Sequence, residues 1–182
     1  MVGRSFIGGV RFCAVAMLVA VTACSSPSRM ITLEDHDEAL EFQKSLQDYS
    51  GSVSDMLRDA QHGKAISDFS MGMLAYDILS TVSSADSGLY AHFTAGGIDI
   101  EDYLKTRFQN NPDREIAALD KISGEGSPSL RAVARNTLDA LAHIPDSHDP
   151  PATQRQNREQ LENALANTKS ALDRAATEVK IP

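Results

Sequence analysis

The sequence has no tryptophan and only two cysteines, Cys13 and Cys24, both near its start. The chain after residue 24 therefore has no disulfide, no thiol nucleophile and no thiolate ligand for a metal. Sugar-binding clefts often stack their ligand on tryptophan, so its absence weighs against that class of ligand. The sequence also has no Gly-rich phosphate loop and no G-x-S-x-G motif. Serine and histidine are present, but their spacing does not identify a catalytic triad. A triad is defined by its geometry in the fold, so the sequence alone does not exclude one.

Long hydrophobic runs are absent as well. The most apolar run extends from Phe12 to Ala23, and about 12 residues of helix cover only roughly 18 Å. The hydrocarbon core of a bilayer is roughly 30 Å thick, so this run is too short to span it comfortably. It follows Arg4 and Arg11 and ends in small residues, which is the order of regions in a secretory signal peptide.

The end of this run, Val21-Thr22-Ala23-Cys24, resembles the lipobox of bacterial lipoproteins. That motif has an aliphatic residue, two small residues and an obligatory cysteine, and Val21 and Thr22 depart from the more usual Leu and Ala or Ser. The resemblance covers only the first 24 residues. It implies cleavage before Cys24 and a lipid on the Cys24 thiol, which anchors the protein in the cell envelope. Ser25 in place of aspartate implies the periplasmic face of the outer membrane, if the host is Gram-negative. The alternatives are a secreted protein cut near Ala23 and an uncleaved signal anchor.

The sequence is therefore divided into a signal peptide at 1–23, a tether at 24–31 and one helical domain at 32–182. Removing the two arginines of residues 1–23 takes the formal net charge from −8 to about −10. Such an acidic surface repels nucleic acid and anionic lipid headgroups. We expect no nucleic-acid partner, and contact with the membrane through the lipid at Cys24.

Apolar residues recur in steps of three and four along most of the chain, and no segment shows a convincing strand pattern. This spacing predicts an all-α bundle of five to seven helices with long first and last helices. The first helix is expected to begin at Thr32, continue through Gly51 and end at Gly63, and a break near residue 51 is the alternative. The last helix is expected to run from Thr153 to Lys180.

The segment 64–85 is the most apolar of the predicted helices and is expected to lie at the centre of the bundle. Both of its apolar stripes are expected to be buried: Ile66, Phe69, Met73 and Tyr76 form one, and Met71, Ala75, Ile78 and Val82 form the other. Four shorter helices follow, over 89–95, after a cap at Asp99, with Pro112 in a first turn, and from Ser127-Pro128.

Two charged clusters are candidate cation sites. They are His143, Asp146, His148 and Asp149 in a Pro-rich loop, and Glu34, Asp35, His36, Asp37, Glu38 and Glu41 around the first helical turn. Neither supplies the Glu-x-x-His pairs of a di-metal bundle, so we expect solvated charges, no metal and no cofactor. Asp77 lies within the apolar segment 64–85, but serines and threonine share its side of the helix, which predicts an exposed or hydroxyl-bonded carboxylate.

The aromatic residues after position 31 all lie in the first half of the expected domain: Phe42, Tyr49, Phe69, Tyr76, Tyr90, Phe93, Tyr103 and Phe108. We expect them to form its core, and a groove for an apolar ligand among them is the alternative.

These features together favour a lipid-anchored, non-catalytic interaction or assembly module of the envelope, such as a secretion accessory or an immunity protein. Its partner is expected to be an envelope protein that binds the exposed faces of helices 32–62 and 152–180. A periplasmic binding protein for an apolar ligand or a cation is the first alternative. An enzyme is the second, and it would need a cluster of histidines and acids that only folding brings together.

Overall fold

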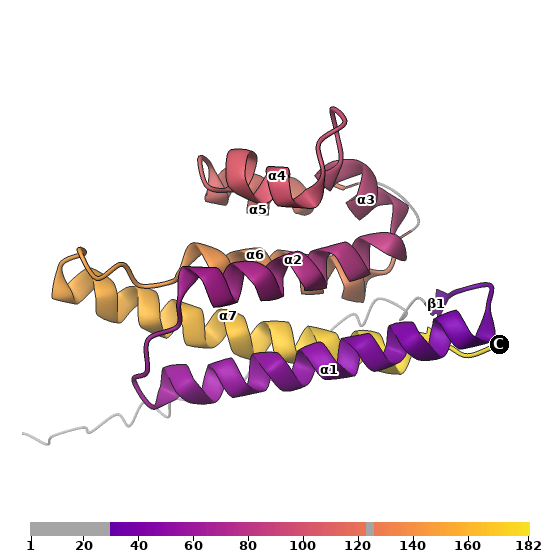
Figure 1. Cartoon of the computed structure of the whole chain (residues 1–182), viewed down its shortest axis with the longest axis horizontal. Coiled ribbons are helices and arrows are strands. Elements are labelled where there is room, and N and C mark those ends of the chain that lie inside the picture. The colour runs from indigo at the N-terminus through magenta and orange to yellow at the C-terminus, as the bar shows by residue number, and fades with distance from the viewer. Residues whose placement is uncertain (1–29, 123–125) are drawn as a thin grey trace, which may run out of the picture.

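Figure 1 shows a computed structural model of the protein, which describes residues 30–122 and 126–182. This part of the chain forms seven α-helices, one π-helical turn and two strands of two residues each. It contains no helix long and apolar enough to cross a membrane. The signal peptide, the lipobox and Cys24 lie outside the described residues, so their assignment stays a prediction.

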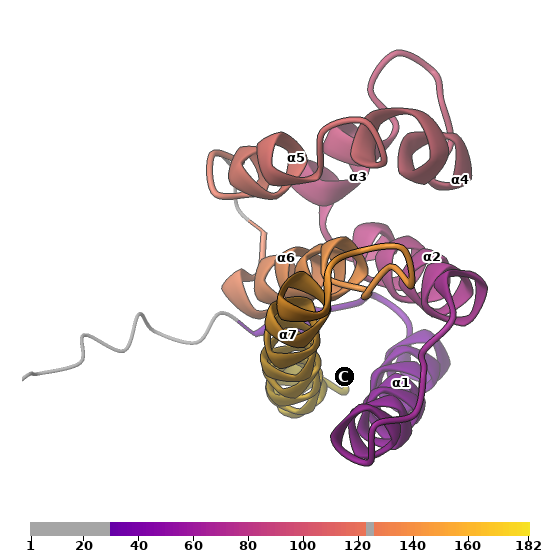
Figure 2. The same cartoon turned by 90° about the vertical axis from the view of Figure 1, so that its left-hand side faces the viewer.

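The helices pack in three layers (Figures 1 and 2). The long helices α1 and α7 lie side by side in the first layer. Helices α2 and α6 form the middle layer, and the third contains the short helices. The bounds are α1 His36–Gln61, α2 Asp68–Ser84, α3 Ser87–Phe93, α4 Ile100–Tyr103, η1 Leu104–Phe108, α5 Pro112–Leu119, α6 Pro128–Ala142 and α7 Pro151–Glu178. The predicted all-α bundle with long first and last helices is therefore confirmed.

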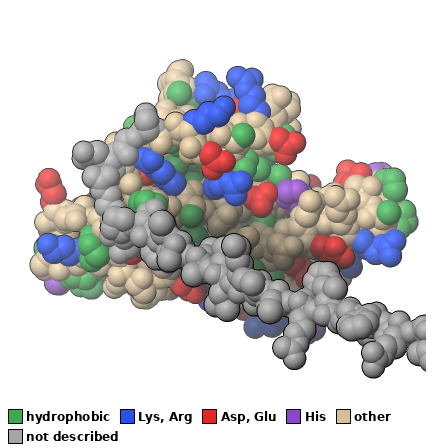
Figure 3. Space-filling model, turned by 180° about the vertical axis from the view of Figure 1, so that it is seen from behind, with side chains coloured by type: hydrophobic (Ala, Val, Ile, Leu, Met, Phe, Trp, Pro, Cys, Tyr) green, Lys and Arg blue, Asp and Glu red, His purple; other side chains and the backbone are tan. Residues whose placement is uncertain are grey.

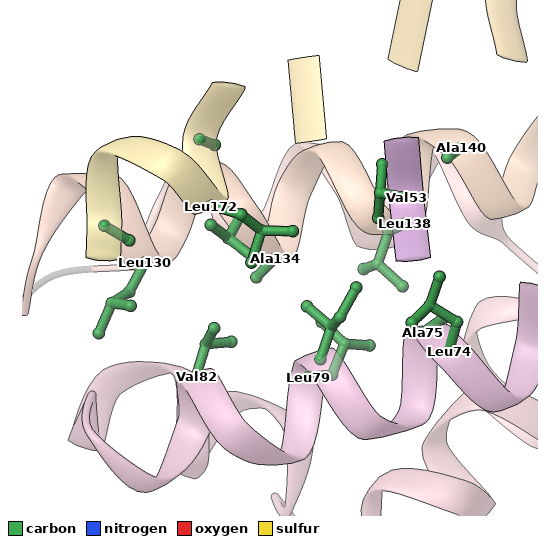
Figure 4. Close-up of a cluster of buried hydrophobic side chains, with 14 of the residues drawn as sticks. Val53, Leu74, Ala75, Leu79, Val82, Leu130, Ala134, Leu138, Ala140 and Leu172 are labelled. Atoms are coloured by element: carbon green, nitrogen blue, oxygen red, sulfur yellow. The ribbon is translucent and has the colours of Figure 1, made fainter. Parts of the chain in front are cut away.

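The core forms where the first two layers meet, and Figure 4 shows its side chains pointing toward one another. Leu79 and Val82 of α2 face Leu138 of α6 and Leu172 of α7, and all four are fully buried. Burying one such side chain contributes about 1.5–3 kcal/mol. This core therefore holds the layer of α2 and α6 against the two long helices.

Capping side chains fix the beginnings of the helices. Ser67, Asp99 and Ser127 each accept a backbone N–H hydrogen bond at the start of α2, α4 and α6, which satisfies a donor that the helix itself leaves free. The cap predicted at Asp99 and the helix start predicted at Ser127-Pro128 are thereby confirmed. Gly63 follows the end of α1 with a φ of 73°, a left-handed conformation that glycine adopts without strain.

The two chain ends correct the predicted bounds of the long helices. Asp35 caps α1, which begins at His36 and not at Thr32, because Ile31–Thr32 forms strand β1. This strand pairs in parallel with β2, Val179–Lys180, so α7 ends at Glu178 and not at Lys180. At its other end α7 begins at Pro151, two residues before the predicted Thr153, because proline suits a first helical turn.

Helix α2 lies in the middle layer as predicted, but only one of its two apolar stripes is buried. Met71, Ala75, Ile78 and Val82 are fully buried. By contrast, Phe69 is 77%, Met73 50% and Tyr76 37% exposed, so their assignment to the core is wrong. Both stripes are apolar, and helical spacing cannot tell which one α6 will cover.

Candidate binding groove

The exposed stripe of α2 forms one wall of an open groove of about 820 Å³. Helix α4 and the π-helical turn η1 form the opposite wall, and the end of α6 closes one side. Buried Leu104 and Phe108 and half-buried Leu141 and Ile144 contribute apolar surface to it. The groove therefore offers an apolar surface to solvent at the end of the bundle where α2 begins.

The residues of α2 in this wall lie on one helical face. Phe69, Gly72, Met73 and Tyr76 are spaced i, i+3, i+4 and i+7, so they are neighbours on the helix surface. A Cβ atom placed on Gly72 would meet no heavy atom within 4 Å. Gly72 therefore leaves an open notch between three large side chains.

The facing wall contains an irregular turn. Over Leu104–Phe108 the backbone is π-helical, and the Gln109 N–H donates to the Leu104 carbonyl at 3.3 Å. Single π-helical turns within helical segments are rare and occur frequently at functional sites. Here the turn places Leu104, Lys105 and Phe108 in the lining of the groove.

Few charges surround the groove. Glu101 and Lys105 pair with each other along the third layer, and this hydrogen bond raises the pKa of the Lys105 ammonium. Asp68 forms no ion pair with any described residue, and its negative charge lies in the first turn of α2, where the helix dipole favours it. On the face of the molecule seen from behind, acidic and basic side chains are interspersed over the described surface (Figure 3).

The charged candidates from the sequence do not meet at this groove. His148 pairs with Asp146 at 2.9 Å in the exposed α6–α7 loop, and His143 lies 3.4 Å from Asp139. The backbone N–H of His148 lowers the pKa of Asp146. Asp35 caps α1 while Glu34, His36, Asp37, Glu38 and Glu41 are exposed, and the described residues contain no group of three or more that could hold a metal ion. Asp77 is exposed, as expected.

A polar cluster that the sequence did not reveal ties the third layer together. The buried Tyr103 hydroxyl donates to Glu115 at 2.9 Å and lies 3.3 Å from His92 Nε2. Burial and the bond to Glu115 raise the pKa of Tyr103 well above its usual value, so its hydroxyl stays protonated and is not a nucleophile. The three residues come from α3, α4 and α5, and none of them lines the groove. Their arrangement fits a structural role.

This cluster predicts a pH dependence of stability. Burial lowers the pKa of His92 below its ordinary 6.5, so between its folded pKa and about pH 6.5 the unfolded chain binds more protons. Stability should therefore fall as the pH drops through this interval. We expect His92→Gln to reduce that fall, measured as the change in urea midpoint between neutral and mildly acidic pH. His148→Gln, which removes an exposed imidazole, is the control. Equal slopes in His92→Gln and the wild type would contradict this assignment.

A second buried polar contact joins the α2–α3 junction to α6. The fully buried Asp86 carboxylate accepts hydrogen bonds from the backbone N–H groups of Gly88 and Leu89, and from Arg131 Nε at 3.2 Å. Arg131 also donates to the Ile122 carbonyl at 2.8 Å. The pair therefore fixes the third layer to the middle layer.

No protein-family model, curated protein or solved structure matches this chain. The groove and the motif at Cys24 are therefore the features that indicate a function.

Proposed function

We propose that this protein is a lipid-anchored accessory of the cell envelope that binds a partner protein through the groove and catalyses no reaction. The exposed apolar face of α2 is the observation that carries this proposal. Phe69, Met73 and Tyr76 together leave roughly 400 Å² of side-chain surface in solvent. Contiguous apolar patches of this size on a soluble domain are often functional.

The anchor proposed at Cys24 and the groove would lie at opposite ends of the bundle. The chain enters the described domain at β1, beside the start of α1, whereas the groove lies at the far end of α1, where α2 begins (Figure 1). With 26 residues, α1 is about 39 Å long. A lipid on Cys24 would thus hold the membrane near one end and leave the groove free for an envelope protein. If the host is Gram-negative, Ser25 assigns the anchor to the outer membrane.

An apolar small molecule is the second candidate ligand. The volume of the groove, about 820 Å³, is in the range of small-molecule pockets. Small-molecule pockets enclose most of the surface of their ligand, however. This groove is open, because Phe69 in its wall is 77% exposed. The open shape therefore favours a protein.

Site-specific crosslinking in cells tests the proposal. A photoreactive amino acid at Met73 should capture an envelope protein. The matched control is Asn163 on the exposed face of α7, the surface that sequence alone favours. Capture from Asn163 alone would show that the partner binds the long helices and not the groove. Capture from neither site, together with saturable binding of a fluorescent fatty acid, would favour the small-molecule candidate instead.

The anchor has its own test. We expect Cys24→Ser to leave the precursor unprocessed or mislocalised, because the thiol that takes the lipid is gone. Mass spectrometry of the mature wild-type N-terminus should find a lipid-modified cysteine. An unmodified N-terminus at Ser25 or beyond would contradict the lipoprotein assignment.

A further inference from the structure

The exposed face of α2 has the geometry of one half of a helix–helix contact. In knobs-into-holes packing, a side chain of one helix enters a hole formed by four residues of the facing helix. Phe69, Gly72, Met73 and Tyr76 have the i, i+3, i+4, i+7 spacing of such a hole, and Gly72 opens it. Glycine inside a helix costs about 0.5–1 kcal/mol relative to alanine. An added Cβ at Gly72 would meet no heavy atom within 4 Å, as at Gly51 in α1, but only Gly72 lines the groove.

The size of the patch weighs against a second copy of this chain as the occupant. A stable interface between folded proteins buries about 800 Å² on each side. The three exposed side chains offer roughly half of that area. A short segment inserted between α2 and η1 could also contact Leu104 and Phe108, which a flat protein surface could not reach.

The charges near the groove indicate which charge a bound segment would carry. Glu101 and Lys105 compensate each other, whereas Asp68, in the first turn of α2, pairs with no described basic side chain. The whole chain has a formal net charge of −8. A basic residue flanking the inserted segment would therefore meet a favourable field at Asp68.

We propose that the groove accepts one amphipathic helix of a partner protein, about two to three turns long, with an apolar face toward Gly72 and a Lys or Arg beside Asp68. This inference rests on the proposed function and specifies the chemistry of the partner. Peptide recognition of this kind places anchor side chains at i, i+3 or i+4, and i+7.

The experiment uses defined peptides and the signal-less protein. One labelled peptide carries leucines on one helical face and lysines on the other. It has about 14 residues, because isolated helices shorter than about 12–15 residues are only marginally stable in water. A second has glutamates in place of the lysines, and a third has the first composition in scrambled order. Fluorescence anisotropy measures binding, and circular dichroism measures the helix content of the bound peptide. The lysine peptide should bind as a helix, and the other two should bind roughly tenfold or more weakly.

Two matched variants connect binding to the groove. Gly72→Trp should weaken binding of the lysine peptide at least roughly tenfold, because the indole fills the notch. Gly51→Trp makes the same change within α1, where an added Cβ also meets nothing within 4 Å, and should leave binding unchanged. Both variants should show the far-ultraviolet spectrum of the wild type, since neither position is packed against a described neighbour.

The outcomes separate this inference from the proposed function. Equal binding by the lysine, glutamate and scrambled peptides, or equal effects of the two tryptophan variants, would overturn the helix inference. Binding of palmitate that Gly72→Trp blocks, without peptide binding, would also overturn it. If the crosslinker at Met73 still captures a protein in those cases, the proposed function stands. If it captures nothing, both fail.

Discussion

Arg131→Met is expected to lower the free energy of unfolding by about 3–5 kcal/mol, because it leaves the buried carboxylate of Asp86 without its counter-ion. Asp86 is shielded from solvent, and its remaining hydrogen bonds come from the backbone N–H groups at the start of α3. Domains of this kind are stable by about 5–15 kcal/mol, so the loss would be a large part of the total. Urea unfolding of the signal-less protein measures it.

Two further variants decide whether the buried charge is the cause. Arg135 lies on α6 like Arg131, and Arg135→Met breaks its exposed pair with Asp120 at the end of α5, which should cost at most about 1 kcal/mol. Adding Asp86→Asn to Arg131→Met should recover part of the loss, because the neutral amide can still cap α3 and no charge stays buried. Equal costs for Arg131→Met and Arg135→Met would mean that water reaches the Asp86 carboxylate.

Phe93→Ala is expected to cost about 3–5 kcal/mol, the range for emptying a large aromatic site in a core. Phe93 is fully buried, and its ring lies edge-to-face on Tyr103 with centroids 4.9 Å apart. Phe69→Ala, the matched substitution on the exposed face of α2, should change stability by less than about 0.5 kcal/mol. Thermal melts of the two variants give the comparison. A large loss in Phe69→Ala would show that another part of the protein covers this face.

The helical class and the starts of α4, α5 and α6 could be read from the sequence, because local chemistry determines them. Asp99 and Ser127 cap their helices through hydrogen bonds with residues three positions later, and Pro112 suits a first helical turn. Neither effect depends on how the helices pack. Gly51 did not interrupt α1, since the apolar residues on either side keep one phase and the buried Val53 lies two residues later. The strands escaped prediction because two residues are too few to show a period.

The groove could not be predicted, because it depends on which face of α2 the rest of the chain covers. Phe69 and Tyr76 look like core residues in a helical periodicity, and the packing of α2 against its neighbouring helices leaves them outside the core. The second apolar stripe of α2 was the available signal, because a stripe that the neighbouring helices leave uncovered becomes an exposed apolar surface. The cluster of His92, Tyr103 and Glu115 likewise arises from three separate helices, and no spacing along the chain connects them.

The pairing of β1 with β2 brings the two ends of the described domain next to each other. Adjacent strands lie about 4.8 Å apart, so the chain enters and leaves the bundle at neighbouring points. Domains with adjoining ends tolerate insertion into a loop of another protein and relocation of their own termini. We therefore expect residues 30–182 to keep their fold when they are inserted into a surface loop of a carrier protein. A fluorescent reporter joined after Pro182 would stand beside the entry point, about one α1 length from Gly72, and would leave the groove unobstructed.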